Sequence, residues 1–151
     1  MRSTTPPGAG PPPDAWRSAG FLFFPRSFYF RQRFGSRVWK ISLDAGLGCP
    51  NRNGTVGSGG CIFCNPASFS PSRRLGPRPI TDQIEAAIAR LRARRRAEQF
   101  VAYFQPGTNT HGPVERLQTL YAEALAHPRV VGLIVGTRPD CVGDEVLDLL
   151  E

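Results

Sequence analysis

The chain has 151 residues, with 19 Lys and Arg against 12 Asp and Glu and a formal net charge of +7. This length suits one domain with a sizeable core. The apolar run Phe21–Phe24 stops at Pro25, whereas a secretory core needs about seven apolar residues and a membrane helix about twenty. The sequence therefore offers neither segment and predicts a cytoplasmic protein without a membrane partner.

The positive charge is carried almost entirely by arginine. Lys40 is the single lysine, and the chain also holds 16 glycines and 15 prolines. Such a composition can reflect coding bias rather than a selected surface. The charge alone therefore does not indicate a nucleic-acid-binding protein.

The N-terminal segments differ in composition. Residues 1–20 are rich in Pro, Gly and Ser and bury too little apolar surface to order themselves, so we expect a disordered tail. Residues 21–37 lead into the fold, and we expect them to form an N-terminal cover segment. Aromatic rings stack on bases, but in this place they more often pack, which we expect for Phe28, Tyr29, Phe30 and Phe34.

Val38 to Leu43 alternates apolar residues with Trp39, Lys40 and Ser42, which predicts the first strand. The next segment opens a loop that contains three of the four cysteines, Cys49, Cys61 and Cys64. Glycines at 54, 57, 59 and 60 let the backbone curl with positive φ. We therefore expect the three sulfurs to converge.

Convergent thiols admit four interpretations. A disulfide with a spare thiol is typical of small secreted chains, and buried unliganded thiols suit apolar surroundings better than a Gly-rich loop. Structural zinc takes four ligands, and the next candidates, His111 and Cys141, are distant in the sequence. An iron–sulfur cluster normally takes four thiolates, so three would leave one iron open to a ligand. The sequence favours the cluster.

The rest of the chain alternates helices and strands. Residues 65–79 are rich in turn formers and predict irregular structure. A helix is then expected from an N-cap at Thr81 to about Ala97. The later elements are a buried strand over 100–104, a polar loop over 105–110, a helix with Pro113 in its first turn that stops at His127-Pro128, a strand over 130–135, a loop over 136–141 and a helix from Asp144.

This order of elements predicts an α/β fold with a parallel sheet and right-handed crossovers. Sites in such folds form from the loops at the carboxyl ends of the strands. The cysteine loop and the loops over 105–110 and 137–141 all occupy such places. We therefore expect the three loops to meet at one edge of the sheet.

Short motifs are spread along the chain from about residue 30 to its end. They are Arg33-Phe34-Gly35, Lys40-Ile41, Asp44-Ala45-Gly46, Cys49-Pro50-Asn51-Arg52, Gly54, Gly59-Gly60-Cys61, Phe63-Cys64 and Thr137-Arg138-Pro139-Asp140-Cys141. With these motifs the chain resembles the YhcC-type radical S-adenosylmethionine (SAM) proteins, relatives of the radical domain of the elongator tRNA-modifying enzyme. The resemblance includes a long glycine-rich gap after the first cysteine, with Asn53 where an aspartate is expected. It implies a partial (β/α) barrel of radical SAM type, of which residues 38–151 hold about the first three βα units.

The resemblance implies a radical SAM enzyme with a [4Fe-4S] cluster held by Cys49, Cys61 and Cys64. Reductive cleavage of S-adenosylmethionine would give a 5′-deoxyadenosyl radical that takes hydrogen from an unknown substrate, with RNA as a candidate. The implied partner is an electron donor such as flavodoxin or ferredoxin. Cofactor contacts are implied for Phe63 at the adenine, for Gln105, Gly107, Thr108 and Asn109 near the methionine amino group, and for Arg138 at the methionine carboxylate.

Several alternatives stay open. Arg138 also suits a salt bridge to Asp140 or Asp144 that fixes its loop, and Cys141 suits packing as a small apolar group. The arginine surplus favours a zinc-stabilised nucleic-acid-binding module as a second function, and a catalytically inactive fragment is a third. Three strand–helix units are half of a radical SAM barrel, so we expect a truncated chain whose third strand exposes its edge.

Overall fold

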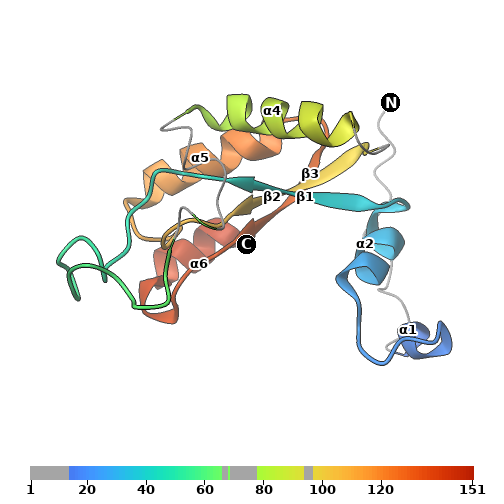
Figure 1. Ribbon diagram of the computed structural model, residues 1–151, viewed down its shortest axis with the longest axis horizontal. Helices are drawn as coiled ribbons and strands as arrows, with labels where there is room; N and C mark the ends of the chain where they lie inside the picture. The colour runs from blue at the N-terminus through green and yellow to red at the C-terminus, as the bar shows by residue number, and fades with distance from the viewer. Residues whose placement is uncertain (1–13, 66–67, 69–77, 94–96) are drawn as a thin grey trace. The chain divides into compact units, whose positions relative to one another are not determined.

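The computed structural model describes residues 14–65, 68, 78–93 and 97–151. The chain divides into two compact units, Met1–Val38 and Trp39–Glu151, each considered by itself (Figure 1). Three predictions fall wholly or partly outside the described residues. They concern residues 1–13 of the tail, residues 66–67 and 69–77 of the irregular stretch, and residues 94–96 near the expected helix end.

The described part of the first unit contains two helices, α1 (Ala15–Ser18) and α2 (Arg26–Phe34). Pro25 is the N-cap of α2, and Gly35 ends it with φ 70°, a left-handed conformation that favours glycine. Of the four aromatic residues expected to pack, Phe30 is buried and Phe28 and Phe34 are half-buried, whereas Tyr29 is exposed. Neither helix is predicted by the sequence, because α1 is a single turn and the apolar residues of α2 follow no clear helical period.

The second unit is built on a three-stranded sheet in the order β1-β2-β3. The strands are β1 (Val38–Leu43), β2 (Gln99–Phe104) and β3 (Val130–Val135). β2 and β3 are parallel, with Phe104 opposite Val135, and all three arrows point the same way in Figure 1. The protein is α/β with a parallel sheet, as the alternation of elements predicts. The radical SAM barrel stays a prediction, because three strands form only an open sheet.

Helices alternate with the strands and pack on one another in chain order. They are α4 (Ile80–Arg92), α5 (Val114–Ala126) and α6 (Asp144–Leu150), with a short 3-10 turn, η2 (Pro139–Cys141), before α6. α5 contacts β3, α4 and α6. No helix in the described ranges is long and apolar enough to cross a membrane.

The core lies between the sheet and the helices. Fully buried side chains come from β1, β2, α4 and α5, and burial of each large one contributes about 1.5–3 kcal/mol. β2 is the middle strand, with β1 and β3 along its two edges. Its neighbouring residues Phe100 and Val101, which point to opposite faces of the sheet, are both buried, in agreement with its continuous apolar sequence. The fully buried residues include Leu43, Ile84, Phe100, Phe104 and Leu117.

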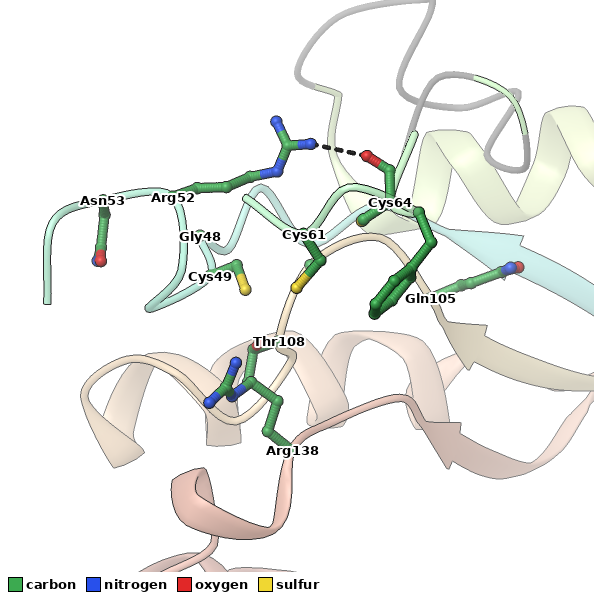
Figure 2. Close-up of a pocket in the computed structure, with 11 residues that line it drawn as sticks. Gly48, Cys49, Arg52, Asn53, Cys61, Cys64, Gln105, Thr108 and Arg138 are labelled. Carbon is green, nitrogen blue, oxygen red and sulfur yellow. Dashed lines mark hydrogen bonds between the residues drawn. The ribbon is translucent and has the colours of Figure 1, made fainter. Parts of the chain in front are cut away.

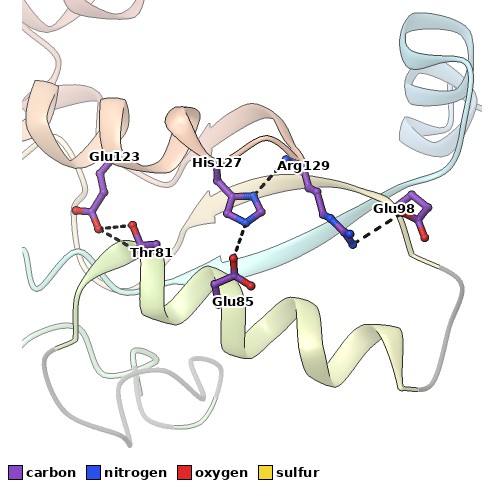
Figure 3. A network of polar contacts seen from close by, with 6 residues as sticks. All are labelled: Thr81, Glu85, Glu98, Glu123, His127 and Arg129. Atoms are coloured by element: carbon purple, nitrogen blue, oxygen red, sulfur yellow. Dashed lines mark hydrogen bonds and ion pairs between the residues drawn. The ribbon is translucent and has the colours of Figure 1, made fainter.

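The predicted N-cap at Thr81 is wrong. Pro79 is the N-cap of α4, and the Thr81 hydroxyl instead donates to Glu123 Oε1 of α5 at 2.9 Å. Figure 3 shows this contact beside a hydrogen bond between His127 Nε2 and Glu85 Oε1 at 3.1 Å. The threonine therefore joins two helices instead of capping one.

His127 is part of this framework. Its Nδ1 accepts the backbone N–H of Arg129 at 3.2 Å, while Nε2 faces Glu85. An acceptor at Nδ1 leaves the proton of the neutral ring on Nε2, where it can be donated to the carboxylate. Arg129 Nη1 in turn lies 3.8 Å from Glu98 Oε2 (Figure 3). His127 thus has a role in the fold.

Gln83 ties α4 to the end of β1. Its Oε1 accepts the backbone N–H of Asp44 at 2.8 Å, and its Nε2 donates to the carbonyls of Asp44 and Arg78, both at 2.9 Å. The side chain is only 7% exposed. Because Asp44 begins the cysteine loop, Gln83 fixes the place where that loop leaves the sheet.

We expect Gln83→Leu to lower the free energy of unfolding by about 1–3 kcal/mol, because the backbone groups of Asp44 and Arg78 lose partly buried hydrogen bonds. Urea unfolding followed by circular dichroism measures the change. The control is Gln118→Leu, the same substitution at an exposed position of α5. Equal stability of the two variants would contradict the role given to Gln83.

Candidate functional site

Three loops meet at the carboxyl edge of the sheet, as the sequence predicts. The cysteine loop follows β1, and the Thr108 N–H donates to the Gly48 carbonyl at 2.9 Å. The Asn109 N–H donates to the Gly136 carbonyl at 3.0 Å. The loop after β2 is therefore bonded to the loops after both neighbouring strands.

Asn109 joins β2 to β3 from a buried position. Its Nδ2 donates to the carbonyls of Phe104 at 3.0 Å and Gly136 at 2.9 Å, and its own carbonyl accepts the Tyr121 hydroxyl. Burial raises the pKa of Tyr121 to about 12, so this hydroxyl stays a donor at neutral pH. Asn109 is fully buried and is not among the residues that line the cavity described below. The structure therefore gives it a role in holding the loops.

Gly107 is where the second loop approaches the first. Its φ is 79°, and an added Cβ would lie 2.8 Å from the carbonyl oxygens of both Leu47 and Gly48. A non-glycine residue would be strained twice here, by its own backbone angles and by the neighbouring backbone. The cysteine loop thus rests on the backbone of Gly107.

A cavity of about 390 Å³ lies between these loops (Figure 2). It brings together all three predicted cysteine ligands and five of the six predicted cofactor contacts, Asn109 being the exception. Gly48, Arg52 and Asn53 are additional lining residues. The complete lining is Gly48, Cys49, Arg52, Asn53, Cys61, Phe63, Cys64, Gln105, Gly107, Thr108 and Arg138.

The three thiols share this cavity but are not gathered around one point. In Figure 2 the side chains of Cys49 and Cys61 extend into the space above Thr108. Within the described ranges, no group of three or more His, Cys, Asp or Glu is arranged to hold a metal ion. A shared centre would therefore require the segment with Cys61 and Cys64 to close further over Cys49.

That segment is well placed to adjust. The Cys64 N–H donates to the Cys61 carbonyl at 2.9 Å, which forms a tight turn. Between the two cysteines, Phe63 is 86% exposed and Ile62 fully exposed. Because no core packing fixes the tip of the turn, its displacement costs little buried apolar area.

The chemistry of the lining suits soft metals. Thiolates are ligands for zinc and iron–sulfur clusters, whereas carboxylates suit harder cations. No Asp or Glu is among the residues that line the cavity. The donor set fits a cluster held through thiolates better than a magnesium or calcium ion.

The surroundings of Cys49 favour its thiolate. Burial, the largest effect, opposes ionisation, but hydrogen bonds from Thr108, the backbone of Asn51 and Arg138, together with the Arg138 charge, lower the pKa of Cys49. Burial and the Asp140 charge instead raise the pKa of Cys141. Cys141 is also absent from the cavity lining, which agrees with packing.

Arg138 forms the ion pair that the sequence offers as its alternative role. Its Nε and Nη2 donate to the two carboxylate oxygens of Asp140 at 2.9 and 2.6 Å. This bond raises the pKa of Arg138 and lowers that of Asp140. Arg138 also lines the cavity, so Asp140 holds it at the edge of the site.

The sequence identifies Asn51 and Arg52 as motif residues and Asn53 as a departure from the motif, but it predicts no contact for any of them. Arg52 Nη2 donates to the Cys64 carbonyl at 3.0 Å, and Asn53 Nδ2 lies 2.9 Å from His111 Nε2 (Figure 2 shows the first contact). Asn51 Nδ2 donates to the Cys61 sulfur at 3.0 Å. Their place in the motif directly after Cys49-Pro50 is the signal that could have pointed to a role in the loop.

We expect Gly107→Ala to lower the free energy of unfolding by about 1–3 kcal/mol, because the new side chain is strained at this φ and meets two carbonyls. The matched control is Gly132→Ala on β3, where an added Cβ would meet no atom within 4 Å. Urea unfolding of both variants decides the point. A Gly107→Ala protein as stable as the Gly132→Ala protein would show that the loops do not approach this closely.

Thr108→Val and Arg138→Gln should each raise the pKa of Cys49, because each removes a group that stabilises the thiolate. The pH at which iodoacetamide labels Cys49 at half its maximal rate should therefore shift upward in the apo-protein, with labelling located by peptide mass spectrometry. Cys141→Ala serves as the control. Unchanged profiles in both variants would contradict the description of this thiol.

Comparison with known proteins identifies relatives over most of the chain. Protein YhcC of Escherichia coli (strain K12) is 48% identical over 119 residues, which cover 79% of this chain and 37% of YhcC. The uncharacterized protein YtqA of Bacillus subtilis (strain 168) is 40% identical over 124 residues, 82% of this chain and 38% of YtqA. The uncharacterized protein MJ0486 of Methanocaldococcus jannaschii is 36% identical over 139 residues, 91% of this chain and 42% of MJ0486.

The relationship covers only part of these relatives. The chain spans about two fifths of the length of the curated proteins it matches. No protein-family model and no solved structure matches it. The resemblance to YhcC is confirmed, whereas the radical SAM chemistry stays a prediction. The chain is a homologue of YhcC, YtqA and MJ0486.

Proposed function

We propose that the cavity holds a [4Fe-4S] cluster through Cys49, Cys61 and Cys64 and binds S-adenosylmethionine for reductive cleavage. The observation that carries this proposal is that the three cysteines, drawn from both ends of a long loop, line one cavity together with residues that follow β2 and β3. Three thiolates leave one iron of such a cluster open to a ligand. The cavity supplies space next to that position.

The fit of the cluster rests on the donor set. The lining offers three thiols and no carboxylate, and the Cys49 thiol already has a lowered pKa. Metal ligation requires deprotonated cysteine. A site that favours the thiolate therefore spends less free energy on deprotonation when it binds a cluster. Closure of the exposed turn between Cys61 and Cys64 would complete the ligand set.

When bound and reduced, the cluster would supply one electron that cleaves the sulfonium of S-adenosylmethionine into methionine and a 5′-deoxyadenosyl radical. The chain's own residues bind and orient that cofactor. We assign the methionine carboxylate to Arg138. Its Nε and Nη2 donate to Asp140, and the guanidinium has further donors on Nη1 that can bind a second carboxylate. Asp140 would keep the guanidinium in place before the cofactor arrives.

The other proposed contacts to S-adenosylmethionine come from residues that line the cavity. Gly107 lets the loop after β2 lie against the cysteine loop. The backbone of Gly107 itself therefore lines the cavity. Gln105 is held by the Ser42 hydroxyl, which donates to its Oε1 at 3.3 Å, so its amide is oriented by β1. Phe63 is 86% exposed and offers an apolar face for the adenine once the turn closes.

The proposal also includes a substrate class and an electron donor. The curated relatives are more than twice as long as the matched region, so further substrate contacts would come from segments other than those described. We propose hydrogen abstraction as the reaction, a flavodoxin or ferredoxin as the electron donor, and RNA as a candidate substrate. RNA is proposed because of the resemblance to the elongator tRNA-modifying enzyme, and the net charge of +7 is compatible with a polyanion.

The test is anaerobic reconstitution of the protein with iron and sulfide, followed by dithionite and S-adenosylmethionine. We expect iron-dependent visible absorbance and formation of 5′-deoxyadenosine, measured by liquid chromatography. Cys61→Ala should lose both, because it removes a cluster ligand. Cys141→Ala should retain cluster binding, since Cys141 does not line the cavity.

Three outcomes would contradict the proposal. Zinc without iron absorbance in the anaerobically purified protein would establish the zinc-stabilised module. A cluster without nucleoside product would indicate an inactive fragment. An equal amount of 5′-deoxyadenosine from the Cys61→Ala protein would contradict the assignment of Cys61 as a cluster ligand.

A further inference from the structure

Asn51 places a hydrogen-bond donor against one of the three cysteine sulfurs. Its side-chain Nδ2 donates to the Cys61 sulfur at 3.0 Å. Asn51 lies two residues after Cys49 in the sequence, so this bond links the start of the cysteine loop to the later pair of cysteines.

The backbone holds Asn51 in this place. The Gly60 N–H donates to the Asn51 carbonyl at 2.8 Å, which brings the segment before Cys61 alongside residue 51. The carbonyl of Cys49 accepts the N–H groups of Arg52 at 2.8 Å and Asn53 at 3.1 Å, which forms a turn around Asn51. The contact to Cys61 is therefore set by local backbone structure and does not depend on a freely rotating surface side chain.

The approach of the amide leaves the cavity free. Cys61 lines the cavity, whereas Asn51 is not among its lining residues. We take the bond to persist when the turn with Cys61 and Cys64 closes over Cys49, because the Gly60 N–H bond to the Asn51 carbonyl keeps the two segments together.

Hydrogen bonds to cysteine sulfurs tune the reduction potential of a cluster. Reduction adds negative charge that is shared with the sulfurs, so a donor stabilises the reduced form more than the oxidised form. We propose that Asn51 is a positioning residue that donates Nδ2–H to the Cys61 sulfur and thereby raises the reduction potential of the bound cluster. This inference rests on the proposed function, since it requires that a cluster is bound.

The experiment compares the wild-type protein with Asn51→Leu and Asn51→Asp after anaerobic reconstitution. Leu and Asp are close to Asn in size; Leu removes the donor, and Asp replaces it with an ionised acceptor. Asn65→Leu is the matched control, because Asn65 is an exposed asparagine next to Cys64. Iron content gives cluster occupancy, and a redox titration followed by electron paramagnetic resonance gives the midpoint potential.

We expect all four proteins to bind the cluster. The midpoint potential should shift downward in Asn51→Leu, shift further downward in Asn51→Asp, and stay at the wild-type value in Asn65→Leu. Asn51 variants that bind the cluster with the wild-type potential would overturn the inference and leave the proposed function intact. So would a loss of the cluster from both Asn51 variants but not from Asn65→Leu, because Asn51 would then only support the loop. A wild-type protein that binds no cluster would overturn the proposed function and this inference with it.

Discussion

The site depends on the close contact between the backbone of Gly107 and the start of the cysteine loop. Parallel strands bring their carboxyl ends to one edge, but this alone leaves loops free to diverge. Here the carbonyls of Leu47 and Gly48 lie where a side chain at 107 would be, and the Thr108 N–H bonds to Gly48. Cys49 follows directly, so the same contact places the first thiol beside the loop that follows β2.

The beginning of the cysteine loop is thus fixed to the sheet by Gln83 and Thr108. The later pair of cysteines is held by hydrogen bonds within the loop, from Asn51 and Arg52, and the turn with Phe63 lies in solvent. The later pair can therefore move together with its part of the loop. This arrangement explains how three thiols line one cavity without being gathered around one point. A bound centre would draw the later pair toward a thiol that is already in place.

Sequence reasoning reached the sheet and most of the cavity because both follow from local patterns. Apolar strands alternate with helical stripes, and polar loops after the strands meet wherever the sheet is parallel. It missed what depends on tertiary contacts. The Thr81 side chain bonds to Glu123, Asn109 is buried behind the cavity, and Arg52 reaches Cys64 across the loop. No periodicity or spacing in the sequence indicates these contacts or the burial of Asn109, because they depend on how other elements pack.

The most direct measurement of the central claim is electron paramagnetic resonance of the reconstituted, dithionite-reduced protein before and after addition of S-adenosylmethionine. A cluster with three thiolate ligands has one iron open, so the cofactor should bind there and change the spectrum of the reduced cluster. The account predicts a cluster signal that shifts with the cofactor and disappears in Cys49→Ala. A signal unchanged by the cofactor, or no cluster signal in the wild-type protein, would contradict it.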